Sequence, residues 1–361
     1  MIGRTFATYL GIRFLRTIGL VFAAMFALIY LLDFVELLRR SSDAQKASTG
    51  FIAFLSLLRV PAVVEQVLPF AVLFGSMAAF LGLSRKLELV VARAAGLSAW
   101  QFLLPPILIV ALIGIFSITV YNPMSALFKQ RADRYETRLF GKTGREDADT
   151  SLWIRQKSVD GQAIIRAERS SDNGMRLAAV TAFVYDKEGR FQERVEAARA
   201  QLLAGFWTFE TARVLRAGEE PATHENYILA SNLTPEQVTQ SFVAPDSVPF
   251  WDLPGVRQRT ELAGLDATGY GLRYQVLLAR PLLLVAMVLV AASFSLRFFR
   301  FGGVSRMVAG GVIAGFVLYV TTKLVGDLGG AGLMSAPVAA WTPAIVGCML
   351  GTLALLHQED G

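Results

Sequence analysis

The chain has 361 residues, of which 54% are hydrophobic and 18% are charged, and its mean hydropathy is +0.47. Soluble domains carry roughly 25% charged residues, so this composition excludes an ordinary soluble protein and indicates a membrane protein. The single cysteine, Cys348, excludes a disulfide framework, and two histidines, His224 and His357, are too few for a zinc cluster.

Six segments are long and apolar enough to be membrane spans, because a bilayer core of about 30 Å needs roughly 20 apolar residues in a helix. They are 17–38, 66–84, a stretch within 94–128, 274–296, 304–325 and 337–356. The first is too long for a signal-peptide core and no A-x-A pattern follows it. We therefore expect it to be a retained anchor.

Basic residues cluster at alternate ends of these spans and predict their orientation. The clusters are Arg4, Arg13 and Arg16; Arg85, Lys86 and Arg93; and Arg297, Arg300 and Arg306. They place both termini and the segment 84–98 in the cytoplasm, and the polar block between spans three and four outside.

The segment 84–98, "SRKLELVVARAAGLS", predicts a short amphipathic helix that ends at Gly96. An apolar stripe at helical spacing would anchor it to the bundle: Leu87, Val90, Val91 and Ala94. Glu88 and Arg93 would then be able to contact a partner. The alternative is an interfacial helix whose charges face lipid headgroups.

The polar block 129–273 is nearly neutral, with 21 acidic and 20 basic residues, so the net charge of +6 belongs to the membrane-like parts. Its pattern changes to short strand-like runs separated by turns such as "DKEGR". Alternation at period two runs through 180–185, and Trp207, Phe209 and Thr211 continue it on one face. We expect an antiparallel sandwich or barrel.

Basic residues also lie where the predicted spans reach the outer leaflet: Arg39, Arg40, Arg59, Arg280 and Lys323. By helical rise, Arg280 is about 24 Å and Lys323 about 28 Å from the cytoplasmic ends of their spans. Such residues are candidates for binding lipid phosphates. The alternative is that they snorkel or pair with acids of the chain, which are Asp33, Glu36, Glu65 and Asp327.

Several stretches together resemble the lipopolysaccharide-export permeases of the LptF and LptG family. They are "ELVVARAAGLS", "LPFAVLFGSMAAFLGLSRKLEL", "SLWIRQ", "SNLTPEQV" (231–238) and "RYQVLLARPLLLVAMVLVAASFSL", in a six-span layout around one large block. "ELVV" and "NLTP" are more similar to the G-type subunit than to the F-type.

The resemblance implies an α-helical membrane protein with six transmembrane helices plus a periplasmic all-β, jellyroll-like domain. The parts would be 1–128 with a coupling helix at about 84–98, 129–273, and 274–361. It further implies a multi-pass permease in the inner membrane of a Gram-negative bacterium. This permease would belong to an ATP-driven transporter that takes lipopolysaccharide from the outer leaflet to a periplasmic bridge.

Its implied partners are a cytoplasmic ABC ATPase dimer (LptB type), a second permease (LptF type), a single-span periplasmic jellyroll protein (LptC type), a bridge protein (LptA type) and lipopolysaccharide, with no nucleic acid and no cofactor. The coupling residues would be Arg85, Glu88, Arg93 and Gly96, with Glu88 as the prominent acid. One departure is that Asp33 and Glu36 precede Arg39 in span one, where the family has basic residues.

Three alternatives remain open at this point. They are the F-type partner of the same exporter, a lipoprotein-releasing permease, and a non-transporting scaffold or sensor. The second usually has four spans, which disagrees with six. The chain is not expected to be an enzyme, because "GKT" at 141–143 lacks the glycine that a phosphate-binding loop needs at Glu136.

Overall fold

The computed structural model describes residues 4–42, 48–140, 152–158, 161–171, 174–216, 218–231, 244–262, 266–297 and 304–359. The chain forms two compact units. The helical unit comprises 1–135, 249–251 and 271–361, and the strand unit comprises 136–248 and 252–270. "SNLTPEQV" beyond Ser231, the "GKT" segment and Arg300 lie outside the described residues.

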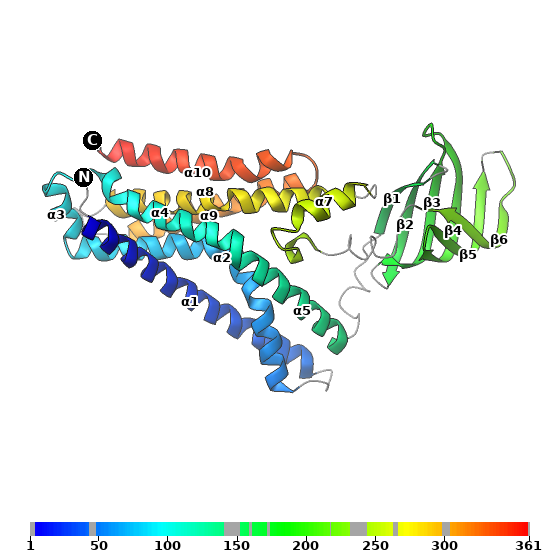
Figure 1. Ribbon diagram of the computed structural model, residues 1–361, viewed down its shortest axis with the longest axis horizontal. Helices are drawn as coiled ribbons and strands as arrows, with labels where there is room; N and C mark the ends of the chain where they lie inside the picture. The colour runs from blue at the N-terminus through cyan, green and yellow to red at the C-terminus, as the bar shows by residue number, and fades with distance from the viewer. Residues whose placement is uncertain are drawn as a thin grey trace. The chain divides into compact units, whose positions relative to one another are not determined.

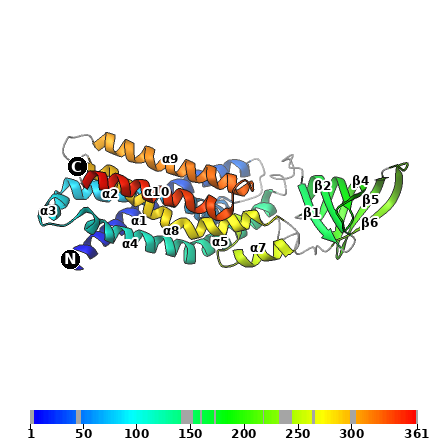
Figure 2. The same ribbon diagram turned by 90° about the horizontal axis from the view of Figure 1, so that it is seen from above.

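Six helices among the described residues are long and apolar enough to cross a membrane, which confirms the six predicted spans. They are α1 (Arg4–Ser42), α2 (Thr49–Arg85), α4 (Ala99–Phe116) continued by the π-helical turn η1 (Ser117–Tyr121) and α5 (Asn122–Phe140), α8 (Thr268–Arg297), α9 (Val304–Gly330) and α10 (Ala336–Glu359). The start of α1, the end of α10 and the short helix α3 (Glu88–Ala94) lie at one end of the helical unit in both views (Figure 1 and Figure 2).

The helices are longer than the apolar segments that predicted them. The largest difference is in α2, which begins at Thr49 and so includes Arg59. A helix satisfies its own backbone hydrogen bonds, so it continues past the apolar residues into polar flanks wherever the side chains can reach water or partners. Apolar length alone therefore locates a span but not its ends.

Burial is unevenly shared among the spans. In α2 and α8, 67% of the most apolar window is buried, whereas in α1 the share is 6% and in α9 it is 11%. The described part of the helical unit therefore has a core built on α2 and α8. Most of α1 and α9 presents apolar side chains outward, as expected of helices that face lipid or a second membrane subunit.

The part of α1 that is buried is concentrated near its N-terminal end, where Leu10, Phe14 and Ile18 join the core. The rings of Phe14 and Phe80 pack edge to face with centroids 4.8 Å apart. Gly75 lets α2 approach closely, because a Cβ atom there would lie 2.6 Å from the Ile18 Cα. This packing fixes one end of α1 against α2.

The strand unit is built on one six-stranded antiparallel sheet in which neighbours along the chain are neighbours in the sheet. The strands are β1 (Leu152–Ser158), β2 (Gly161–Ser171), β3 (Arg176–Tyr185), β4 (Phe191–Leu203), β5 (Phe206–Arg216) and β6 (Ala222–Ala230), and the unit also holds η3 (Pro245–Ser247) and α7 (Leu253–Leu262). Together with the six spans, this sheet confirms the predicted class, a helical membrane protein with a separate β part.

The first and last strands are joined by the buried side chain of Gln156 in β1. Its Nε2 donates to the carbonyl of Ala230 in β6 at 3.3 Å. Its Oε1 accepts from Trp207 Nε1 at 3.1 Å and from the Ser231 hydroxyl at 2.7 Å. The sheet therefore curls far enough to bring β1 beside the end of β6, around a core that contains Trp207 and Phe209.

Three adjacent strands change the phase of their buried positions at the same level of the sheet. The buried pairs there are three residues apart instead of two: Leu177 and Val180 in β3, Ala197 and Ala200 in β4, and Phe209 and Ala212 in β5. Ala179 and Thr211 have positive φ angles of 52° and 53°, so the backbone of β3 and β5 leaves the ordinary strand conformation at this level. The period-two alternation predicted through Trp207, Phe209 and Thr211 therefore breaks at Thr211, which is exposed, whereas Ala212 is buried.

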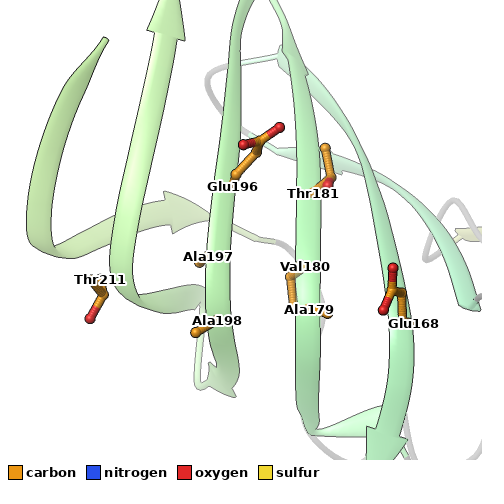
Figure 3. Close-up of a pocket in the computed structure, with 8 residues that line it drawn as sticks. All are labelled: Glu168, Ala179, Val180, Thr181, Glu196, Ala197, Ala198 and Thr211. Carbon is orange, nitrogen blue, oxygen red and sulfur yellow. The ribbon is translucent and has the colours of Figure 1, made fainter.

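At this level of the sheet, Ala179, Ala198 and Thr211 have no partner in the strand register of the described residues. Pairing of β2 with β3 goes from Ala167↔Val180 to Arg169↔Ala178 and omits Ala179. Figure 3 shows Glu168, Ala179, Ala198 and Thr211 following one another across β2 to β5, where they line a shallow hollow of about 340 Å³.

Candidate functional site

The short helix α3 lies between the second and third spans and has seven residues, Glu88 to Ala94. It is shorter than the predicted helix at about 84–98, because α2 runs to Arg85 and Ser98 caps α4. Left-handed residues stand at both of its ends: Leu87 has φ 60° and Gly96 has φ 84°. The amide of Leu97 donates to the carbonyl of Ala92 at 3.1 Å, which closes the C-terminal end over Gly96.

The face that α3 turns to the bundle is not the predicted one. Leu89 and Ala92 are buried, each with 6% exposed, whereas Leu87 and Val91 are 52% and 67% exposed. The predicted anchoring stripe of Leu87, Val91 and Ala94 was therefore wrong, and it forms an outward apolar surface. Helical periodicity predicts which residues share a face of a helix, but it does not predict whether that face points toward the bundle or away from it. Here the left-handed turn at Leu87, just before α3, sets the direction. The side chains of Val90 and Arg93 lie outside the described part of the structure.

The carboxylate of Glu88 contacts two side chains of α1, Tyr9 and Arg13. Nη1 of Arg13 in α1 lies 3.0 and 3.1 Å from the two carboxylate oxygens of Glu88, and the Tyr9 hydroxyl donates to Oε2 at 3.0 Å. Arg13 Nη1 also donates to the Tyr9 hydroxyl at 2.5 Å. Both charged side chains are half-buried, at 18% and 25% exposed.

Of the four predicted coupling residues, Glu88 has this contact with α1, Arg85 is exposed at the end of α2, and Gly96 ends α3. The sequence analysis missed Tyr9, and it used Arg13 only as a signal of orientation. Their signal was present in the sequence, since they lie four residues apart just before the first apolar segment and carry groups that complement an acid.

A second polar cluster lies inside the helical unit around Glu65 of α2. Nη1 of Arg280 in α8 lies 2.5 Å from Glu65 Oε1, and Nη2 of Arg273 lies 3.4 Å from the same oxygen. Ser125 donates to Oε2 at 2.6 Å, and Asn122 donates to Oε1 at 2.9 Å. The Glu65 and Arg280 side chains are only 2% and 8% exposed. This is a buried ion pair whose carboxylate has further donors on both oxygens.

The π-helical turn η1 brings its helix into this cluster. Ser117, its first residue, accepts from Arg280 Nη1 at 3.2 Å, and Asn122, just after the turn, holds the Phe250 amide at 2.9 Å. Just before the turn, Gly114 lets α4 approach α8, because a Cβ atom there would lie 2.6 Å from the Pro281 Cα. Single π-turns inside α-helices are frequent at functional positions.

Each of the five predicted phosphate-binding residues is paired with an acid of this chain. Arg39 and Arg40 share Glu36 at 3.0 and 2.9 Å, and Arg59 lies 3.7 Å from Asp33. Lys323 lies 3.3 Å from Asp327, and Arg280 pairs with Glu65 as described. The structure brings Arg39 and Arg40 together on α1, and it sets Arg280 apart inside the bundle.

Comparison with known proteins matches the sequence to one family. The sequence profile described as "Lipopolysaccharide export system permease LptF/LptG" matches residues 8–357. The chain belongs to the LptF/LptG family. It is similar to the lipopolysaccharide export system permease protein LptG of Escherichia coli strain K12, with 23% identity over 89% of each chain.

The LptG protein of Haemophilus influenzae is 21% identical over 94% of this chain and 93% of its own length. Family membership and the six apolar helices make the protein a multi-pass protein of the inner membrane.

Proposed function

We propose that the chain is the G-type permease subunit of an ATP-driven lipopolysaccharide exporter. The observation that carries this is the short helix α3, which lies between two spans of an LptF/LptG-family protein and presents an apolar surface outward. It would extract lipopolysaccharide from the outer leaflet of the inner membrane and pass it to a periplasmic bridge. Both termini and α3 would be cytoplasmic, and the strand unit, as the jellyroll-like domain of 129–273, would be periplasmic.

The ATPase contact is proposed to lie on α3. Leu87, just before α3, and Val91 within it are more than half exposed, so they suit an apolar groove on a soluble partner. Arg85 and Arg93 would add charged contacts at the rim, and Gly96 would set the angle between α3 and α4. The partner is proposed to be an ABC ATPase dimer of LptB type, as the resemblance to the LptF/LptG permeases implies.

The lipid path is proposed to run along α1 and α9, in contact with the second, F-type permease. Their outward apolar side chains would contact acyl chains, and exposed cations near one end of α1 would contact the phosphates. Arg39 and Arg40 are 76% and 53% exposed and both pair with Glu36, which is itself 41% exposed, so a phosphate can compete with Glu36 for them. Lys323 is 68% exposed and suits the same role. Arg59 would contribute from α2, whereas Arg280 is committed to Glu65 and would act by shaping the bundle.

The strand unit is proposed to receive the lipid and to contact periplasmic partners of LptC and LptA type. Its curled sheet encloses an apolar core that includes Trp207 and Phe209, a chemistry that suits acyl chains. The alternative of a non-transporting scaffold or sensor would use the same unit to bind a partner without any ATPase.

Purification of the tagged chain from its own membranes, with mass spectrometry of what co-purifies, tests the transporter proposal. We expect a soluble ABC ATPase and a second six-span permease. Val91→Glu should reduce recovery of the ATPase at least about tenfold, because it puts a charge into an apolar contact. Leu262→Glu, at an 81% exposed apolar residue of α7, is the matched control and should leave recovery unchanged. Absence of an ATPase from an intact preparation would favour the scaffold.

Crosslinking of lipopolysaccharide to the purified complex tests the phosphate contact. Arg39→Glu combined with Arg40→Glu should weaken crosslinking, because the pair then repels phosphate. The control is Arg257→Glu, which reverses an exposed arginine of α7 that is likewise paired with a nearby acid. Equal crosslinking in both variants would remove Arg39 and Arg40 from the lipid site.

A further inference from the structure

The guanidinium of Arg13 joins three helices at one point. It belongs to α1, its Nη1 bridges both carboxylate oxygens of Glu88 in α3, and its Nη2 lies where a side chain on Gly82 of α2 would be. A Cβ atom at Gly82 would lie 2.9 Å from that nitrogen. The Tyr9 hydroxyl completes the joint by bonding to both Arg13 and Glu88.

Apart from this joint, the described side chains that hold α3 to the bundle are apolar. It is a helix of seven residues with a left-handed residue at each end, Leu87 and Gly96, and its buried anchors are Leu89 and Ala92. Apolar contacts are non-directional and allow a short helix to rotate or slide. Charge-assisted hydrogen bonds are directional, so the Arg13–Glu88 contact fixes the direction in which a movement of α3 is passed on.

The other helix of the joint, α1, has most of its buried residues around Arg13. Near its N-terminal end, α1 is packed into the core by Leu10, Phe14 and Ile18, and Arg13 lies within this stretch. Beyond it, few positions of α1 are buried until Leu37. Further along, α1 contacts α2 through the Arg59–Asp33 ion pair at 3.7 Å and the hydrogen bond from the Ser56 hydroxyl to the Tyr30 carbonyl at 3.5 Å. A displacement applied at Arg13 therefore acts on the packed N-terminal part of a long helix whose middle has few buried positions.

We propose that Arg13 is a positioning residue that ties α1 to α3, so that Glu88 acts through Arg13 within the chain, and movement of α3 by the ATPase is delivered to the first span. This rests on the proposed function. The outward apolar residues Leu87 and Val91 make the ATPase contact, and the Tyr9–Arg13–Glu88 joint transmits it.

The test uses the complete exporter, purified with its ATPase and reconstituted with lipopolysaccharide in proteoliposomes. Three quantities are measured: ATPase retained, ATP hydrolysed, and lipopolysaccharide released per ATP. Arg13→Gln should retain the ATPase and its hydrolysis but lower release per ATP about five-fold, the effect of losing one partly exposed charge-assisted contact. Arg13→Lys, which keeps the charge, should recover most of the release.

Further variants isolate the joint from general stability. Gly82→Ala should lower release per ATP in the same way, because its methyl group displaces only the flexible end of Arg13. Gly19→Ala, whose added Cβ atom meets nothing within 4 Å, is the matched control on α1 and should release normally. Exchange of the charges, Arg13→Glu with Glu88→Arg, should recover at least half of the release lost in Glu88→Arg alone.

The outcomes separate the inference from the proposed function. If the unsubstituted chain neither retains an ATPase nor releases lipopolysaccharide, the proposed function fails whatever Arg13 does. If it does both and Arg13→Gln releases as much per ATP as the unsubstituted chain, the inference alone is overturned. An exchanged pair no better than Glu88→Arg would also overturn it, since Glu88 would then act elsewhere.

Discussion

Replacing Glu65 by glutamine should destabilise the helical unit more than any exposed charge change. The substitution keeps the shape of the side chain, but it replaces one accepting oxygen by an NH2 donor and leaves the Arg280 guanidinium buried without its counter-charge. Glu65 is 2% exposed and Arg280 is 8% exposed, with 2.5 Å between Oε1 and Nη1. Removal of one partner from such a buried pair costs about 3–5 kcal/mol. For a unit of roughly 150–250 residues this corresponds to a fall in Tm of roughly 6–20 °C.

Thermal unfolding of the purified chain in detergent, followed by circular dichroism, measures this effect. Lys323→Met is the matched control, because it breaks an ion pair whose two side chains are 68% and 63% exposed and should cost less than about 1 kcal/mol. The double variant Glu65→Leu with Arg280→Met removes both charges and should regain at least half of the lost stability. If Glu65→Gln costs no more than Lys323→Met, or if the double variant is no better than the single, the buried pair does not hold the bundle together.

Three further predictions concern other contacts. Gln156→Leu removes three hydrogen bonds that join β1 to β5 and β6, so amide exchange in β1 should become about 100-fold faster, and unchanged exchange would show that the seam holds without them. Gly75→Ala should lower the free energy of unfolding by about 1–3 kcal/mol, because its methyl group meets the backbone of α1. Gly19→Ala is the control and should leave the free energy of unfolding unchanged. Equal effects of the two substitutions in thermal unfolding would contradict the close approach of α2 to α1. Hydrogen bonds from the backbone and side chain of Arg190 lower the pKa of Asp186 below its ordinary value of 3.8. The stability that this gives the turn is present above pH 3.8 and lost as the pH falls through the lowered pKa, so protection of the Arg190 amide should decrease there, and constant protection would contradict it.

The spans and the sheet could be predicted from the sequence because each is a local pattern. A run of about 20 apolar residues has few alternatives to a membrane helix. The ends could not be predicted, and Arg59 shows why: it lies within α2 although it precedes the apolar segment that was expected. Alternation at period two predicted β5 correctly as a strand, but the phase change at Thr211 depends on a backbone angle that composition does not reveal.

The candidate site was predicted in part. Glu88 could be singled out from its segment and the family resemblance, but its partner could not, because Arg13 lies 75 positions away in the sequence and the pairing depends on how α1 crosses α2. The same holds for Arg280 and Glu65, which are 215 positions apart. The sequence left pairing with acids as one alternative to phosphate binding, and only the packing of α8 against α2 gives the distance between these two charges.

The phase change shared by β3, β4 and β5 limits how the sheet can evolve. If a strand gained or lost one residue beside Ala179 or Thr211, its remaining side chains would move to the opposite face of the sheet. Apolar residues would then be exposed and charged residues buried. The strand's neighbours, still in the old phase, could not follow. Lengths of these strands should therefore vary among descendants of this chain in steps of two residues, or by one residue in all three strands together.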